Sequence, residues 1–90
     1  MKFSIIIPAY NVADYLEKCV KSVLIQEFKD YEILIINDGS TDATAIVADK
    51  LSVENTNKVR VLNQTNGGAS KARNTGIESA RGCLLYTSDA

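Results

Sequence analysis

Short apolar segments alternate along this chain with longer stretches in which apolar residues recur every three or four positions. The apolar segments are residues 3–8, 31–36 and 59–62, and each is rich in Ile, Leu or Val. Runs of this length and composition are typical of strands that are buried on both faces of a parallel sheet. This alternation constrains the fold more than any other feature of the sequence, and it predicts three strands.

Three helices are expected between and after these strands, over residues 12–24, 43–51 and 69–80, because apolar residues recur there with helical spacing. The order of strands and helices predicts an α/β domain with right-handed crossovers, a parallel sheet and helices on both of its faces. In such sheets ligands bind at the carboxyl ends of the strands. Residues that follow each strand are therefore the candidates for a binding site.

The expected helices also suggest which residues cap them and which face the core. Asn11 is the expected N-cap of the first helix, and Ser40 or Thr41 that of the second. The core-facing residues of the second helix are expected to be Ala43, Ile46, Val47 and Leu51. Those of the third are mostly small, which lets a helix lie close to a sheet; they are Ala69, Ala72, Gly76, Ile77 and Ala80.

Composition limits the classes of partner. The chain has 90 residues, so it forms one small domain or a part of one. Ten Lys and Arg residues against eleven Asp and Glu leave a formal net charge of -1, which gives no general attraction to nucleic acid or to an anionic membrane. Cys19 and Cys83 lie far apart in a chain without histidine, which argues against a zinc site or a disulfide framework. The N-terminal apolar run stops at Pro8, so no signal peptide or membrane span is expected.

The turn after the first strand, Pro8-Ala9-Tyr10-Asn11, contains no glycine. A dinucleotide-binding fold needs a glycine-rich turn there, so a nicotinamide-dependent oxidoreductase is disfavoured. Tyr10 is able to stack on a base, and Asp38, after the second strand, is able to accept a hydrogen bond from a base N–H or a ribose hydroxyl. Each residue alone also fits a purely structural role, in a core edge, a cap or a turn. Their convergence on one edge of the sheet favours a nucleoside pocket.

Two cations, Lys71 and Arg73, lie near the start of the third expected helix. The helix dipole disfavours positive charge at this end, whereas an anion is stabilised there. One of the two side chains is therefore expected to contact a phosphate, with a solvated helix face as the alternative.

Four motifs now occur in order: SIIIPAYN at residues 4–11, DGSTD at 38–42, NGG at 66–68 and ARNTG at 72–76. Together they resemble the N-terminal half of family 2 glycosyltransferases, over residues 2–82. The resemblance implies a Rossmann-like GT-A fold, truncated here. It also implies an inverting enzyme that transfers a sugar from a nucleoside-diphosphate sugar, a UDP-sugar, to an acceptor hydroxyl in bacterial polysaccharide or envelope glycan synthesis. The expected location is cytoplasmic, with the full-length protein able to lie at the inner face of the membrane.

The same resemblance implies roles for individual residues. Asp38 is expected to hydrogen-bond the uracil, and Lys71 or Arg73 to lie near the diphosphate. A divalent metal, Mg²⁺ or Mn²⁺, is expected in the full-length enzyme. The complete expected nucleotide-sugar site is Pro8, Ala9, Tyr10, Asn11, Asp38, Gly39, Ser40, Gly67, Gly68, Lys71 and Arg73.

The last eight residues, CLLYTSDA at 83–90, depart from the family pattern, which continues with a fourth strand that ends in an Asp-x-Asp metal motif. We interpret residues 1–82 as the nucleotide-sugar-binding part of a glycosyltransferase domain. Residues 83–90 are interpreted as an aberrant tail from adapter sequence or a frame error, and Asp89 as a poor metal ligand. The chain itself is then expected to lack the metal motif and the catalytic base. The alternative is a non-catalytic nucleotide-binding module.

Overall fold

The computed structural model describes residues 3–25, 30–81 and 83–87, the last segment as backbone only. The three expected strands and three expected helices are all present, and each strand runs one or two residues further than the sequence pattern indicated. The elements are β1 (Phe3–Ala9), α1 (Ala13–Leu24), β2 (Tyr31–Asp38), α2 (Thr44–Glu54), β3 (Val59–Gln64), α3 (Ala69–Ser79) and β4 (Cys83–Thr87).

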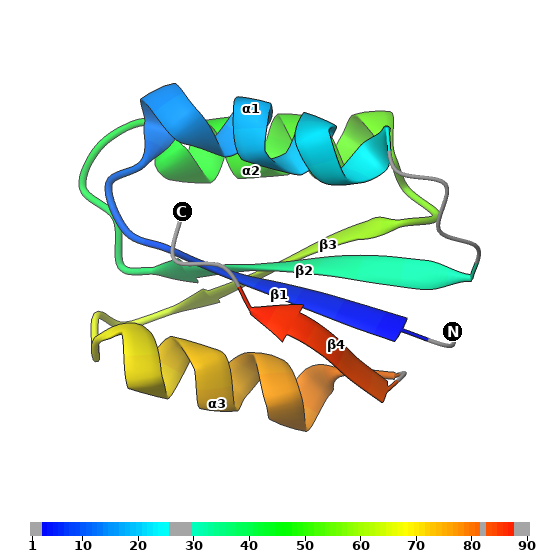
Figure 1. The fold of residues 1–90 in the computed structure, drawn as a ribbon. Helices are drawn as coiled ribbons and strands as arrows, with labels where there is room; N and C mark the ends of the chain where they lie inside the picture. Colours follow the sequence, from blue (N-terminus) through cyan, green and yellow to red (C-terminus); the bar gives the residue numbers. More distant parts are fainter. Residues whose placement is uncertain (1–2, 26–29, 82, 88–90) are drawn as a thin grey trace.

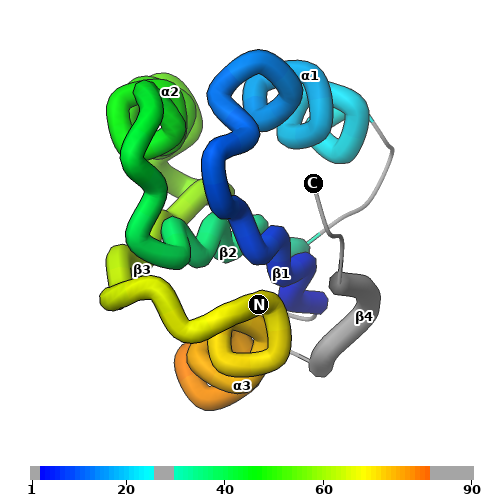
Figure 2. Tube along the Cα trace, turned by 90° about the vertical axis from the view of Figure 1, so that its left-hand side faces the viewer, coloured from blue at the N-terminus to red at the C-terminus, as the bar shows by residue number. Residues whose placement is uncertain are grey.

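The strands form one parallel sheet in the order β3-β2-β1-β4. Helices α1 and α2 cover one face and α3 covers the other (Figures 1 and 2). The expected α/β architecture with helices on both faces of a parallel sheet is confirmed.

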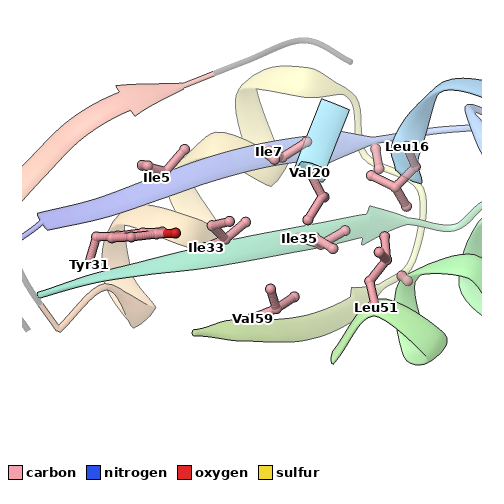
Figure 3. Packing of buried hydrophobic residues seen from close by; sticks show 11 residues of the cluster. Ile5, Ile7, Leu16, Val20, Tyr31, Ile33, Ile35, Leu51 and Val59 are labelled. Atoms are coloured by element: carbon pink, nitrogen blue, oxygen red, sulfur yellow. The ribbon is translucent and has the colours of Figure 1, made fainter. Parts of the chain in front are cut away.

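Side chains alternate between two cores because successive residues of a strand point to opposite faces. Ile5, Ile7, Ile33 and Ile35 pack against α1 and α2 in the larger core (Figure 3). The residues between them pack against α3 in the smaller core, which contains Ile6, Leu34, Ile36 and Ala72. Every residue of β2 is buried, so this strand forms the centre of both cores.

The small inner face of α3 brings it close to β1. Ala72 and Gly76 are buried, as expected, and a Cβ at Gly76 would lie 2.5 Å from Cγ2 of Ile6. Ala69 and Ile77, in contrast, were wrongly expected to face the core, because Ala69 is exposed and Ile77 is 47% exposed. The expected inner face of α2 was wrong at Ala43, which is exposed and precedes the helix, and at Ile46, which is 72% exposed. The buried stripe of α2 is Thr44, Ala48 and Leu51, because the Thr44 hydroxyl finds polar partners that allow its burial.

The fourth strand was not expected in this chain. Residues Cys83–Thr87 pair in parallel with β1, with a shift of register between Ser4 and Ile5. The segment is apolar and contains an aromatic and a β-branched residue, which is typical of strands. The interpretation of residues 83–90 as a foreign tail stays a prediction, and Asp89 lies outside the described residues.

A buried carboxylate joins the strands at the end of the sheet where they begin. Glu32, in β2, is fully buried. Its Oε2 accepts hydrogen bonds from the Ser4 hydroxyl at 2.7 Å and from the Arg81 N–H at 2.7 Å. Its Oε1 accepts two from Arg60, from Nε at 3.1 Å and Nη2 at 2.9 Å. Arg60 also donates to the Ser79 carbonyl at 2.8 Å, so the network ties β1, β2, β3 and the end of α3 together.

Replacing Glu32 by Gln should lower the free energy of unfolding by about 3 kcal/mol, because the amide presents a donor to groups that are already donors and leaves Arg60 without a charged partner. Urea denaturation followed by circular dichroism measures the loss. Glu78→Gln, at an exposed position of α3, is the control and should be neutral. An equal effect of both substitutions would show that the network contributes nothing specific.

Stability should also depend on pH through Glu32. Burial alone would raise the pKa of this carboxyl, but the hydrogen bonds from Ser4, Arg81 and Arg60 and the charge of Arg60 hold it below its ordinary value of 4.5. A lowered pKa means that the stabilisation is complete above the unfolded-state value and is lost as the pH falls through the folded-state value. The difference in melting temperature between wild type and Glu32→Gln should therefore shrink as the pH is lowered from 6 to about 3.

Candidate functional site

Three loops meet at the carboxyl end of the sheet: residues 10–12, 39–43 and 65–68. They lie together at the left of Figure 1, and this edge faces the viewer in Figure 2. The strand order reverses between β1 and β4, because the chain builds outward from β1 to β3 and then crosses to the other side of β1. Ligands of open α/β sheets bind at such a reversal, beyond the carboxyl ends of the strands.

The first two loops are joined by hydrogen bonds around Asn11. Its side-chain Oδ1 accepts from the N–H of Thr41 at 2.8 Å and of Asp42 at 3.3 Å. Its own N–H donates to Oγ of Ser40 at 3.1 Å. Asn11 has a φ of 51°, a left-handed conformation that Asn adopts more readily than most residues. The expectation that Asn11 caps α1 was wrong, because its oxygen is used between the loops.

One carboxylate, that of Asp42, lies at the start of both neighbouring helices. Its Oδ1 accepts from the N–H of Thr44 at 2.8 Å, and its Oδ2 from the N–H of Ala13 at 3.4 Å. The Thr44 hydroxyl also donates to this carboxylate and accepts from the Val12 N–H at 2.9 Å. The hydrogen bond from the Thr44 hydroxyl is the main cause of a lowered Asp42 pKa. The expectation that Ser40 or Thr41 caps α2 was wrong, because its N-cap residue is Ala43 and the side-chain acceptor at its start is Asp42.

Asp38 is the centre of the second and third loops. It ends β2 directly opposite Gln64 of β3, and it is only 3% exposed. Its Oδ1 accepts from Nε2 of Gln64 at 2.7 Å and from the Gly67 N–H at 2.9 Å. Its Oδ2 accepts from the Gly68 N–H at 2.9 Å.

The charge of Asp38 is stabilised by these contacts. Burial alone would raise its pKa, but the hydrogen bonds from Gln64, Gly67 and Gly68, together with the positive charge of Lys71, hold the pKa below the ordinary value. Asp38 is thus a buried, ionised acceptor at the expected ligand edge of the sheet.

The glycines at this edge fit tight spaces or unusual backbone angles. Gly39 has a φ of 68°, and a Cβ there would lie 2.6 Å from the N atom of Asn66. Gly68 has a φ of 91°, and a Cβ there would meet no atom within 4 Å. At Gly67 a Cβ would overlap Cδ of Lys71, at 2.1 Å. Gly39 is needed for the close approach of two loops, whereas Gly68 faces open space.

The remaining expected site residues differ in accessibility. Pro8 and Ala9 are buried in β1, whereas Tyr10 is 49% exposed just after it. Lys71 is exposed in the first turn of α3, and Arg73 is half-buried further along the helix. Tyr10, Asp38 and Lys71 therefore all lie at the carboxyl edge of the sheet, in or beside the three loops that meet there. Contact of any of them with a ligand stays a prediction.

The described residues do not supply a metal site. Within residues 3–25 and 30–81, no group of three or more His, Cys, Asp or Glu side chains is arranged to hold a metal ion. The two carboxylates at this edge, of Asp38 and Asp42, already accept hydrogen bonds from the protein. In the same part of the chain no helix is long and apolar enough to cross a bilayer.

Sequence reasoning missed four residues that build this edge: Asp42, Gln64, Asn66 and Thr75. Gln64 was assigned to a loop, although a third strand as long as the second would have placed it beside Asp38. Asn66 donates through Nδ2 to the Asp38 carbonyl at 3.0 Å. Asp42 was noticed only as part of a turn motif.

Two substitutions of Asn11 should separate its two roles. Asn11→Gly keeps the left-handed backbone but removes the acceptor, and should cost about 1 kcal/mol of unfolding free energy. Asn11→Ala removes the acceptor and also strains the backbone, and should cost about 1 kcal/mol more. Chemical denaturation compares the variants. Equal losses would argue that the positive φ contributes nothing.

Comparison with known proteins gives a consistent result. The sequence model of glycosyl transferase family 2 matches residues 4–90. An uncharacterized glycosyltransferase, EpsJ of Bacillus subtilis, is 46% identical over 82 residues, which cover 91% of this chain and 24% of that protein. Chondroitin synthase of Pasteurella multocida is 47% identical over 87 residues, 97% of this chain and 9% of that protein. The crystal structure of S. aureus TarS 1-349 in complex with UDP-GlcNAc superposes with a TM-score of 0.85 at 35% identity, covering 99% of this chain and 27% of that one. The chain spans about a quarter or less of the length of these relatives.

Proposed function

Because this chain belongs to glycosyl transferase family 2 and has the GT-A fold, we propose that residues 1–82 form the donor-binding part of an inverting enzyme. The donor is a nucleoside-diphosphate sugar, specifically a UDP-sugar, and the acceptor is a hydroxyl group. The proposed role of the whole protein is in bacterial polysaccharide or envelope glycan synthesis, on the cytoplasmic side of the membrane. Chondroitin synthase and EpsJ among the relatives support a role in glycan synthesis.

The observation that carries this proposal is the buried, ionised Asp38 at the end of β2, together with the exposed Tyr10 directly after β1, the strand that pairs with β2. An anionic acceptor fits the polarised N–H of a uracil, and an exposed aromatic ring fits the face of a base. The complex of TarS with UDP-GlcNAc supports the choice of a uridine nucleotide.

The diphosphate is proposed to lie at the start of α3. The N–H groups of Gly67 and Gly68 are bonded to Asp38, so they stabilise the loop and not the phosphate. The first turn of α3 and the charge of Lys71 remain as the anion-binding groups. The open space beside Gly68 leaves room for a ligand at this position.

The chemistry of inversion requires groups outside the described residues. An acceptor hydroxyl attacks the anomeric carbon from the face opposite the diphosphate; a carboxylate takes the hydroxyl proton as the new bond to carbon forms and the bond to the diphosphate breaks. A divalent metal would stabilise the charge on the leaving diphosphate. Family 2 enzymes generally depend on such a metal. In the proposed reaction the described residues bind and orient the donor.

Replacing Asp38 by Ala should weaken UDP binding by about tenfold or more, the expected effect of losing a charge-assisted hydrogen bond. Calorimetric titration of the whole protein with UDP in the presence of Mg²⁺ measures the affinity, and circular dichroism confirms folding. Asp49→Ala, at an exposed position of α2, is the matched control. Unchanged UDP affinity in folded Asp38→Ala protein would refute the role of Asp38, and no UDP binding by the wild type would refute the proposed donor.

A further inference from the structure

A chain of side-chain hydrogen bonds runs from the middle of α3 to Asp38. The hydroxyl of Thr75 lies 2.6 Å from Oε1 of Gln64. Nε2 of Gln64 then donates to Oδ1 of Asp38 at 2.7 Å. The expected nucleotide site included neither Gln64 nor Thr75, yet both act on the acceptor at its centre.

The donor and acceptor in each of these hydrogen bonds are fixed by the negative charge of Asp38. An ionised carboxylate only accepts hydrogen bonds, so the amide of Gln64 must turn its NH₂ group toward Asp38. Its oxygen then faces Thr75, whose hydroxyl must donate to it. The Lys71 carbonyl lies 3.0 Å from the same hydroxyl, but a hydroxyl has one proton, and the shorter contact is to Gln64.

The number of donors to Asp38 limits what else it can bind. A carboxylate has about four acceptor positions, two on each oxygen. Among the described residues, Gln64 and Gly67 donate to Oδ1, whereas Gly68 alone donates to Oδ2. Glu32 provides a comparison in the same chain, because each of its oxygens accepts two hydrogen bonds. Glu32 is saturated, whereas Asp38 keeps one acceptor position, on Oδ2.

One acceptor position matches some bases and not others. The Watson–Crick edge of uracil has a single N–H between two carbonyl groups and needs one acceptor. Guanine presents an N–H and an NH₂ side by side, and both are satisfied by a carboxylate only when each oxygen is available. A carboxylate with Oδ1 already occupied is therefore suited to uracil and poorly suited to guanine.

We propose that Gln64 and Thr75 are positioning residues: Gln64 takes the acceptor position of Asp38 Oδ1 that Gly67 leaves open, Thr75 orients Gln64, and together they set the preference of the site for uracil over guanine. The inference rests on the proposed function, because it assumes that Asp38 meets the base. Gln64 acts directly on the carboxylate, and Thr75 acts through Gln64 by fixing the direction of its amide.

The test is the ratio of GDP to UDP dissociation constants, measured by calorimetry on the whole protein with Mg²⁺. Wild type should prefer UDP. Gln64→Leu frees one acceptor position on Oδ1, while the Gly67 N–H keeps the other, and it should reduce the preference about tenfold. Thr75→Val removes only the hydroxyl and should reduce it about threefold, and Thr75→Ser should restore it. Thr56→Val, exposed between α2 and β3, is the matched control and should leave the ratio unchanged.

The outcomes separate this inference from the proposed function. If wild type binds no UDP, both are wrong. If wild type prefers UDP but Gln64→Leu and Thr75→Val weaken UDP and GDP equally, the residues only maintain the fold, and the inference alone is overturned. Thr75→Val and Thr75→Ser keep the test decisive if Gln64→Leu fails to fold, because they change one half-buried group.

A second measurement distinguishes positioning from simple support. The hydrogen bond from Gln64 helps to lower the pKa of Asp38, so in Gln64→Leu that pKa should rise. UDP binding needs the ionised carboxylate. As the pH is lowered, the UDP affinity of Gln64→Leu should therefore begin to fall at a higher pH than that of wild type. Superimposable pH profiles of UDP binding for the two proteins would overturn the inference.

Discussion

The in-register pairing of β2 with β1 and β3 is the constraint on which the other features depend. All eight residues of β2 are buried, so polar side chains are tolerated in this strand only where partners reach them. They occur at its two ends, as Glu32 near the start and as Asn37 and Asp38 at the finish. The apolar residues between them build the cores on both faces, and the pairing carries each polar end to its partners in neighbouring strands.

The two ends of the sheet use carboxylates differently. At the end where the strands begin, Glu32 accepts two hydrogen bonds on each oxygen and is enclosed by Arg60, Ser4 and the chain near Arg81. At the other end Asp38 accepts three hydrogen bonds from the part of the chain that the structure describes, which leaves one acceptor position on Oδ2. Buried polar groups stabilise a fold when all their bonds are made. The acceptor position left at Asp38 is the feature on which the proposed contact with a base depends.

The sequence predicted the elements of this fold well, because strand and helix patterns are local. It also indicated the correct edge of the sheet, since parallel strands bring their carboxyl ends together. It failed where the outcome depends on register or on competing partners. Asn11 was expected to cap a helix and instead joins two loops. Gln64 was placed in a loop because residues 63–68 are rich in turn formers, and its pairing with Asp38, which is distant in the sequence, was not foreseen. Ile46 was expected inside, but the hydrogen bonds of Thr44 turn another stripe of α2 inward.

The position of Asp42 has a consequence for how this part of the molecule opens. Its carboxylate accepts N–H groups at the start of both α1 and α2, while its own N–H donates to Asn11 in the loop before α1. Neither helix can fray at this end without disturbing the carboxylate group whose other oxygen the second helix uses. The beginnings of α1 and α2 therefore behave as a single cooperative unit, and local unfolding of one loop exposes the amides of both helices together.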